Sequence, residues 1–164
     1  MAIHKIQIDD FVTIDYELIA IHSSTEDYRL AYFINQTLQI LLEKSTKDIS
    51  VTSAKAEGCF SRFFFEDADT GVVWDFIQNK TTRAITKTTS TSNASLFSEA
   101  EIAITASSSL LPELKKVDYI LKVENVPSSF KPNAVVNQLL GIKHITTAYT
   151  IDHDKLKSKN NLIF

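Results

Sequence analysis

The segment Leu111-Pro112-Glu113-Leu114-Lys115-Lys116-Val117-Asp118-Tyr119-Ile120-Leu121-Lys122-Val123-Glu124 carries the clearest structural pattern in the chain. From Val117 onward, apolar side chains recur at every second position, and the charged side chains of Asp118, Lys122 and Glu124 stand at three of the positions between and after them. A period of two is typical of a half-buried β-strand. Pro112 interrupts regular structure before this strand, because proline has no backbone N–H to donate. The segment therefore predicts that regular structure ends at Pro112, that a charged connection follows, and that an amphipathic strand covers residues 117–124.

Two helices are expected on either side of this strand. Apolar residues recur at three- and four-residue steps within residues 25–44, which predicts one helix. Its start is marked by Ser23 and Glu26, whose spacing is that of a capping box. A second helix is predicted over residues 132–140, since proline is tolerated in the first turn of a helix. Gly141 is placed to end it in a left-handed cap.

Strand patterns occupy much of the remaining chain. The predicted strands cover residues 14–22, 48–52, 59–66, 72–78, 83–88, 101–106 and 144–152. Residues 59–66 and 72–78 flank a turn rich in Asp and Gly, and they predict a hairpin. Past Leu18, residues 14–22 are apolar on both faces, which predicts an interior strand. In residues 144–152, one face carries Ile145, Thr147, Tyr149 and Ile151.

The order of these elements predicts an α+β fold. Two strand–helix–strand units around an antiparallel sheet, with two main helices, indicate a ferredoxin-like layer elaborated by extra hairpin strands. The length of 164 residues is that of a single domain, 1–164. Within it, the Thr- and Ser-rich residues 89–95 predict a mobile loop, and residues 155–164 predict a docking C-terminal tail.

The composition of the chain argues against several classes of protein. The net charge of −3 disfavours nucleic-acid binding, which needs a basic face to displace phosphate counterions. No apolar run reaches the roughly 18 residues that a membrane-spanning helix needs, and the N-terminus lacks the apolar run of a signal peptide. Cys59 is the single cysteine of the chain and cannot form an internal disulfide. We therefore expect a cytoplasmic protein.

Residues 111–119 resemble the signature of the IPExxxVDY family, a group of small bacterial proteins named for that string. Leu111 stands where the family name has isoleucine, and the other named positions match. Residues 22–29 also resemble the N-terminal block of the family, and the end of the chain resembles the way in which family members end. The family has no established function, so the resemblance implies kinship and no particular chemistry.

A polar cluster between the first strand and the first helix is the candidate ligand-binding site. Its residues are His22, Ser23, Ser24, Glu26, Asp27 and Arg29. Such strand–helix junctions are favoured binding places, and a pocket is expected between this cluster and the second helix near residues 128–133. Two acids in the first turn would repel an anion, however. Capping of the helix is the competing interpretation, and we favour it.

Other reactive residue types predict no catalytic or metal site. Cys59 lies in a Phe-rich strand, where a free cysteine is usually a small buried hydrophobe. Asp152-His153-Asp154 is expected on a strand, where adjacent side chains point to opposite faces and rarely bind one metal ion. Glu113 and Asp118 lack a neighbouring nucleophile, so a structural role is favoured, with Glu113 binding either backbone N–H groups or an Arg across the turn. We therefore expect no cofactor, no metal and no enzymatic activity.

The chain ends on Leu162, Ile163 and Phe164. Apolar residues in such a position usually dock, either on their own core or on another subunit. The leading hypothesis is therefore a non-enzymatic protein that acts through association, as a homo-oligomer or with another protein. The alternative is a small-molecule-binding regulatory domain, which rests on analogy at the level of fold.

Overall fold

The computed structural model describes residues 16–53, 56–87 and 102–164. In chain order the elements are β1 (Tyr16–His22), α1 (Asp27–Leu38), β2 (Glu43–Lys44), β3 (Ile49–Ser53), β4 (Ala56–Phe60), β5 (Arg62–Glu66), β6 (Val73–Gln78), β7 (Lys80–Lys87), β8 (Ile102–Ser109), η2 (Pro112–Leu114), β9 (Tyr119–Glu124), α2 (Pro132–Leu140), β10 (Thr147–Ile151), η3 (His153–Lys155) and η4 (Lys159–Leu162). The loop predicted at residues 89–95 lies outside the described residues, as do the first two residues of the strand predicted from Ile14.

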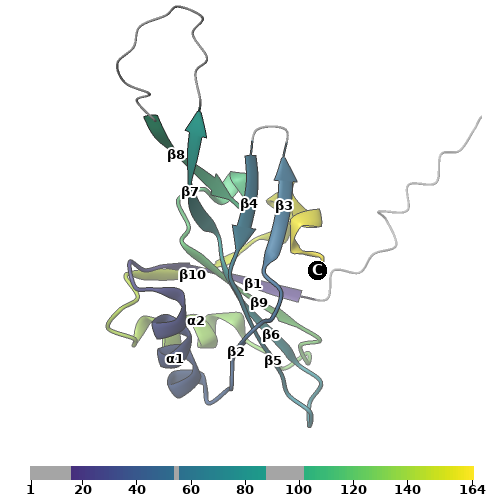
Figure 1. The fold of residues 1–164 in the computed structure, drawn as a ribbon. Coiled ribbons are helices and arrows are strands. Elements are labelled where there is room, and N and C mark those ends of the chain that lie inside the picture. The colour runs from purple at the N-terminus through teal and green to yellow at the C-terminus, as the bar shows by residue number, and fades with distance from the viewer. Residues whose placement is uncertain (1–15, 54–55, 88–101) are drawn as a thin grey trace, which may run out of the picture.

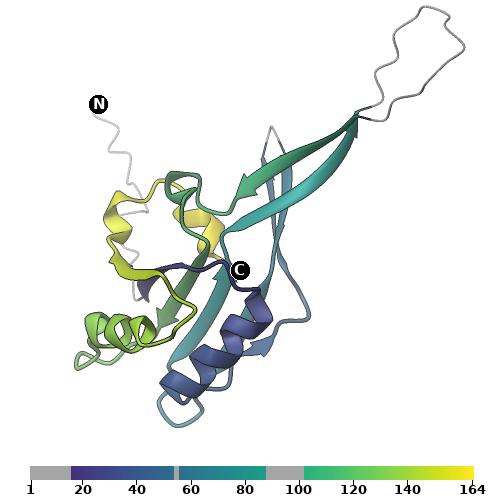
Figure 2. The same cartoon turned by 90° about the vertical axis from the view of Figure 1, so that its left-hand side faces the viewer.

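Six strands form one antiparallel sheet in the order β10-β1-β9-β6-β5-β2. α1 follows β1, and α2 joins β9 to β10. Both helices pack on the same face of the sheet, where they share one apolar core (Figures 1 and 2). The predicted α+β class, with two helices and an antiparallel sheet, is therefore confirmed.

Each face of the sheet carries its own core. The core under the helices includes Ile19, Ile21, Leu30, Ile34, Phe76, Leu121, Val123 and Leu139. The core on the opposite face includes Leu18, Ala20, Phe60, Ile77, Leu111, Ile120, Leu156 and Leu162. Residues of β1 alternate between the two cores and none of its four central residues is exposed. β1 is thus the interior strand that its apolar faces predicted.

β9 is more deeply buried than its sequence predicts. The alternation of apolar and charged residues predicted a half-buried strand, yet every residue from Tyr119 to Val123 is buried. Lys122 is only 5% exposed; its Nζ donates to the carbonyl of Leu162 at 2.8 Å and pairs with Glu124. The prediction of a solvated face is wrong because the C-terminal segment covers it.

α1 ends earlier than predicted. The helix stops at Leu38, and Gln39 takes a left-handed conformation with φ of 56°. Asn35 then holds the departing chain, because its amide donates to the carbonyl of Leu42 at 3.1 Å and accepts from the N–H of Leu42 at 2.8 Å. These side-chain bonds replace those that further helical turns would make. After Gln39, Leu42 is buried in the core and Ile40 packs against it, whereas Leu41 is 60% exposed.

The strand predicted over residues 59–66 is broken at Ser61. Its first half, β4, pairs with β3 in a separate two-stranded sheet, and its second half, β5, pairs with β6. The predicted hairpin between residues 59–66 and 72–78 is confirmed for β5 and β6, and Gly71 adopts the positive φ of 71° that its turn needs.

The strand predicted over residues 83–88 does not extend the large sheet. Residues 83–87 belong to β7, which pairs with β8 in a ribbon that projects from the body (Figures 1 and 2), and Thr88 lies outside the described residues. The chain leaves the sheet at Asn79, whose N–H donates to the carbonyl of Asp118 and whose carbonyl accepts from Leu110. These two bonds redirect the backbone between β6 and β7.

The end of α2 and the start of β10 also differ from the predictions. Gly141 has φ of −71°, so the predicted left-handed cap is wrong; the chain continues in right-handed turns, with Ile142 N–H donating to the carbonyl of Leu139 at 3.0 Å. β10 consequently begins only at Thr147. Ala148 and Ile151 are its buried residues, and the single apolar face predicted for the longer strand is not formed.

Two short 3-10 turns, η3 and η4, carry the C-terminal segment across the face opposite the helices. Leu156 and Leu162 are buried there in the core of the same chain. Within the described ranges, no helix combines the length and the apolar character needed to cross a membrane.

Candidate functional site

A cleft of about 440 Å³ opens where β1 ends and α1 begins. One wall is the β1–α1 connection, residues 23–27. The other wall comes from the ends of β6, β7 and β9, and contributes Gln78, Lys80, Asp118 and Tyr119. We call this the helix-start cleft. It unites the polar cluster and the signature segment, which the sequence separates by about 95 residues.

Asp118 ties the two walls of the helix-start cleft together. Its Oδ2 accepts a hydrogen bond from the backbone N–H of Ser23 at 3.1 Å, and its Oδ1 pairs with Lys80 Nζ at 2.7 Å. His22 Nδ1 lies 3.9 Å from the same Oδ2. Because a lysine and a backbone N–H both engage the carboxylate, Asp118 acts as a structural link between strands.

Tyr119 fixes the connection at a second point. Its hydroxyl donates to the carbonyl of Thr25 at 2.6 Å. The pKa of Tyr119 is raised to about 12. Burial is the larger cause, and the negative charges of Asp27, Asp118 and Glu26 add to it. The phenol therefore keeps its proton at neutral pH and serves as a hydrogen-bond donor.

Ser23 is buried but does not cap α1. Its Oγ donates to the carbonyl of His144 at 2.7 Å and accepts from the N–H of Thr25 at 3.1 Å. The N-cap residue is Glu26, whose side chain makes no capping bond. The predicted capping box is therefore wrong, because Asp118 and His144 hold Ser23 in the connection before the helix.

A polar chain leads from the cleft toward β3. The carboxylate of Asp27 accepts from the hydroxyl of Ser61, whose oxygen accepts from Lys44 Nζ at 2.9 Å. Lys44 also pairs with Asp48 at 2.5 Å, and Cys59 Sγ lies 3.7 Å from Asp48 Oδ2. A cysteine nucleophile is activated by a histidine base or by a positively charged neighbour, whereas the hydrogen-bond partner of this thiol is a negatively charged carboxylate.

The structure brings together most of the predicted ligand-binding residues. Those that line the cleft are Ser23, Ser24, Glu26 and Asp27. His22 lies behind them and stacks on Tyr149, with ring centroids 5.7 Å apart. Arg29 is exposed on α1 and does not line the cleft.

Sequence reasoning missed Gln78 and Lys80. The register of the sheet places Gln78 opposite Tyr119, and no local pattern in the sequence indicates that pairing. The helix-start cleft is not lined by residues 128–133, contrary to the expectation of a pocket beside the second helix. Pro132 and Asn133 instead border a separate hollow near the end of β10, because α2 packs on β10 and β1.

Asn79 holds the signature segment from within the protein. Its side chain has no exposed surface. The amide nitrogen donates to the carbonyls of Leu114 and Val117, each at 2.8 Å, and the amide oxygen accepts from the N–H of Leu111 at 3.0 Å. One asparagine thus satisfies three backbone groups of the turn that follows Pro112.

Glu113 joins the signature to the C-terminal segment. Its Oε1 accepts from the backbone N–H groups of Lys157 and Ser158, each at 2.6 Å. Partial burial raises the pKa of the Glu113 carboxyl, but the hydrogen bonds outweigh that effect and the pKa is lowered from its ordinary value. Backbone N–H groups are one of the two kinds of partner that the sequence left open for Glu113, and these bonds support a structural role.

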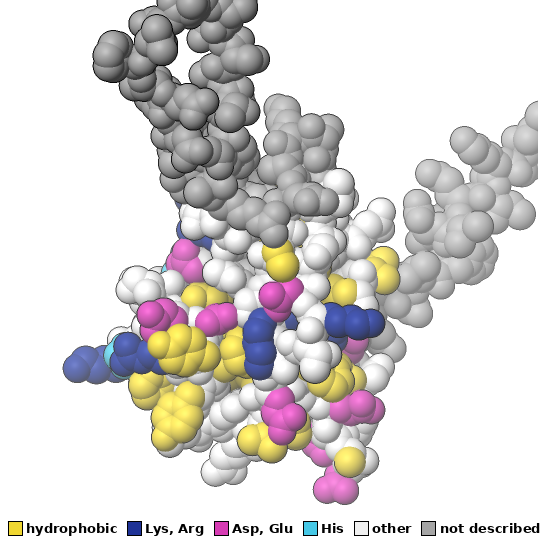
Figure 3. Space-filling model, in the orientation of Figure 1, with side chains coloured by type: hydrophobic (Ala, Val, Ile, Leu, Met, Phe, Trp, Pro, Cys, Tyr) yellow, Lys and Arg dark blue, Asp and Glu magenta, His cyan; other side chains and the backbone are white. Residues whose placement is uncertain are grey.

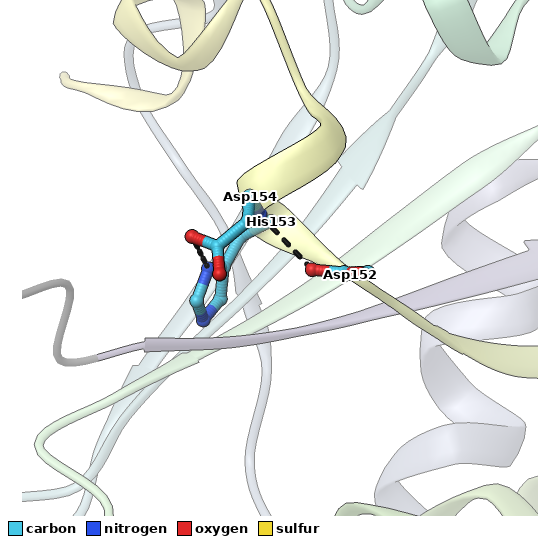
Figure 4. A group of neighbouring side chains, drawn as sticks. All are labelled: Asp152, His153 and Asp154. Atoms are coloured by element: carbon cyan, nitrogen blue, oxygen red, sulfur yellow. Dashed lines mark hydrogen bonds and ion pairs between the residues drawn. The ribbon is translucent and has the colours of Figure 1, made fainter.

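Asp152, His153 and Asp154 gather in one turn (Figure 4). The prediction that they point to opposite faces of a strand is wrong, because β10 ends at Ile151 and their ligand atoms lie within 4.8 Å of one another. Asp152 accepts from the N–H of Asp154 and pairs with Lys155, each at 3.1 Å. The cluster is largely exposed and its carboxylates have local partners, so we assign no metal site to it.

A second hollow, of about 470 Å³, lies between β3 and the C-terminal segment. One side is formed by residues 47–52, the other by Asn160, Asn161, Ile163 and Phe164, and Arg62 also lines it. We call this the tail groove. Of the predicted interaction residues, Leu162 is 1% exposed in its own core, whereas Ile163 and Phe164 are 78% and 44% exposed at the groove.

Arg62 is held in place beside the tail groove. Its Nε donates to Asp75 at 2.7 Å, and its guanidinium lies 4.3 Å from the ring of Phe164 and 5.2 Å from that of Phe64. Asp75 is 1% exposed; burial raises the pKa of its carboxyl, and the bond from Arg62 offsets part of that rise. The stacked, hydrogen-bonded guanidinium is thus pre-oriented.

Acidic and basic side chains are interspersed over the face that Figure 3 shows. In the helix-start cleft, the serine and tyrosine hydroxyls of Ser23 and Tyr119 donate to backbone carbonyls, and Lys80 pairs with Asp118. The two hydroxyls are thus engaged by backbone carbonyls and the lysine by a carboxylate, and these groups form no nucleophile–base pair among the described residues. No family model, curated protein or solved structure matches the chain. The geometry of the molecule itself therefore has to support any function.

Proposed function

We propose that the protein acts without catalysis, through protein–protein association, and that it forms a homo-oligomer by pairing of β10 with β10 of a second copy. The observation that carries this proposal is the character of the two edges of the six-stranded sheet. An edge strand presents unpaired backbone N–H and C=O groups, which natural proteins usually protect.

The two edges differ sharply. β2 has only two residues, Glu43 and Lys44, and both are charged and exposed. A short charged strand resists pairing with another chain. β10 has five residues without charge or proline, and its only strand neighbour among the described residues is β1. The β10 edge thus lacks the usual protection.

The composition of β10 suits pairing with itself. In an antiparallel pair about a two-fold axis, each strand contributes the same residues, and a charged residue near the axis would face its own copy. β10 contains Thr, Ala, Tyr and Ile alone. Tyr149, at its centre, is 41% exposed and offers a large contact surface.

Light scattering coupled to size-exclusion chromatography tests the proposal. We expect the wild-type chain to elute as an oligomer and Tyr149→Lys to shift it to the monomer, because two lysines would then lie close to the axis. Tyr32→Lys is the matched control, since Tyr32 is 58% exposed on α1, away from this edge, and should leave the oligomer intact. A monomeric wild type would overturn the proposal.

A small-molecule-binding regulatory domain is the second candidate. The helix-start cleft favours it, because this cleft joins the polar cluster to the signature segment. A metabolite screen by thermal shift tests it, since a ligand that binds the folded state raises the melting temperature. A genuine ligand should lose its effect in Gln78→Ala, which changes the lining without breaking a described hydrogen bond.

Three further assignments belong to the same proposal. The signature at residues 111–119 supports membership of the IPExxxVDY family. The order β10-β1-β9-β6, with a helix after β1 and another after β9, supports a ferredoxin-like layer. The single cysteine supports a cytoplasmic location.

A further inference from the structure

We propose that the tail groove binds an extended, acidic segment of a partner protein, which adds a strand to the open edge of β3. This binding site is separate from the β10 edge and doesn't depend on self-association. Addition of a strand is a common way for a sheet edge to recognise a peptide, with backbone hydrogen bonds supplying affinity and side-chain contacts supplying specificity.

Among the described residues, β4 is the only strand neighbour of β3, so the backbone along the other edge of β3 is available for such pairing. β3 pairs with β4 along one edge over its whole length, from Ile49 to Ser53. Six consecutive residues, 47–52, line the groove, so the groove runs along the strand rather than across it. The C-terminal segment forms the opposite wall. An extended peptide in this groove would lie beside the second edge of β3, parallel or antiparallel to it.

The charges of the groove select an acidic segment. Its lining contains two basic residues, Lys47 and Arg62, against one acidic residue, Asp48, although the whole chain has a net charge of −3. Asp48 pairs with Lys44 at 2.5 Å and Arg62 pairs with Asp75 at 2.7 Å, so Lys47 supplies the unbalanced positive charge of this lining among the described residues. Among the described residues, Lys47 makes no ion pair, and Arg62 uses only its Nε to bind Asp75. The remaining guanidinium N–H groups can therefore bind a carboxylate.

Apolar contacts complete the site. Ile163 and Phe164 stand exposed on the wall opposite β3, and Val51 is only partly buried. Successive side chains of a strand point to opposite faces, so a segment that alternates acidic and apolar residues matches both features. The residues of β3 itself, Ile49-Ser50-Val51-Thr52-Ser53, include no acid. A partner of different sequence therefore fits the groove better than β3 of a second copy.

Fluorescence anisotropy with synthetic peptides and the full chain tests the proposal. The probe is a labelled peptide that alternates Glu and Val, and its matched control alternates Lys and Val. We expect the acidic peptide to bind and the basic peptide to bind at least about tenfold more weakly, because the basic residues of the groove attract one and repel the other. Equal affinity for both peptides would overturn the proposal.

Charge reversal in the protein locates the binding site. Lys47→Glu should weaken binding of the acidic peptide about tenfold. Lys143→Glu makes the same change in charge at an exposed residue outside the groove and should leave binding unchanged. If both variants weaken binding equally, the effect arises from net charge and the groove is not the site.

Backbone methylation distinguishes strand addition from simple charge attraction. Alternate N–H groups of a paired strand point toward the same neighbour. Two acidic peptides, N-methylated at odd or at even positions, should therefore differ, with one losing binding and the other retaining it. Equal binding of the two would contradict strand addition. If no peptide binds while Lys47→Glu dissociates an oligomer, the occupant of the groove is a second copy and the proposal is wrong.

Discussion

Asn79 shows how one side chain organises the signature segment. It lies between β6 and β7 with no exposed surface, and it bonds to three backbone groups of residues 111–117. Backbone groups in such a buried turn have no access to water, so each needs a partner within the protein. The turn after Pro112 is therefore held by a residue that lies more than 30 positions away in sequence.

Replacing Asn79 with alanine should lower the free energy of unfolding by about 3 kcal/mol, because buried donors and acceptors would be left unpaired. Urea denaturation measures the change. Asn137→Ala is the matched control: Asn137 is exposed on α2, where alanine is the better helix former, so stability should be unchanged or slightly raised. Equal effects of the two substitutions would contradict the role of Asn79.

Glu113 should give the protein a pH-dependent contribution to stability. Its folded-state pKa is lowered from the ordinary value of 4.5, so the contribution is fully present above that value and is lost as the pH falls through the folded-state pKa. Glu113→Gln should therefore lower stability at neutral pH, and the difference from wild type should shrink at about pH 3. Urea titrations at both pH values measure this difference in stability. A difference that does not change with pH would contradict a stabilising role for the charged carboxylate of Glu113.

The end of α1 illustrates the limits of periodicity at the scale of an element. Apolar residues continue at helical spacing past Leu38, yet Gln39 turns the chain into a left-handed conformation. The local bonds of Asn35 to Leu42 stabilise the extended path that follows. A residue with a Cβ is strained in this conformation, and glycine is the usual occupant of such a helix end.

Gln39→Gly should raise the free energy of unfolding by roughly 0.5–1 kcal/mol, because glycine relieves the strain of a positive φ. The matched control is Gln36→Gly within the same helix, which should lower stability by roughly 0.5–1 kcal/mol because glycine is a poor helix former. Thermal or urea denaturation of the pair should thus show changes of opposite sign. Destabilisation by both substitutions would contradict the left-handed helix end.

At the scale of the whole molecule, two cores on opposite faces of one sheet stabilise the fold. The first is closed by the two helices, and the second is closed by the C-terminal segment, through Leu156 and Leu162. Glu113 and Lys122 anchor that segment to the signature strand and its preceding turn. The C-terminal segment is therefore a structural layer of the domain as well as one wall of the tail groove.

Two neighbouring substitutions test this layer. Leu162→Ala should lower the free energy of unfolding by about 3 kcal/mol, because it leaves a cavity in a core where Leu162 is 1% exposed. Ile163→Ala should change it by no more than about 0.5 kcal/mol, since Ile163 is 78% exposed. Urea denaturation again supplies the measurement. Similar small effects at both positions would mean that the segment does not contribute to the core.

The sequence predicted the candidate site in halves. Residues 22–29 were predicted as a polar cluster because of their local composition, whereas Asp118 was considered only with Glu113 in the signature and given a structural role. Their meeting point was not recognised, nor were Gln78 and Lys80, because the register of β6 against β9 arises from pairing between distant segments. The same limit applies to Ser23, whose partner His144 lies more than 100 residues away.

The sequence by itself determined the α+β class, the presence of the two helices and of most strands, the interior position of β1 and a structural role for Glu113. Those features follow from side-chain periodicity and from the hydrogen-bonding capacity of single residues, which are local properties. Only the tertiary structure decided the burial of both faces of β9, the length of α1, the helix-start cleft, the tail groove and the contrast between the β10 and β2 edges. These features depend on which distant segments cover or pair with one another, and a local sequence pattern does not specify those contacts.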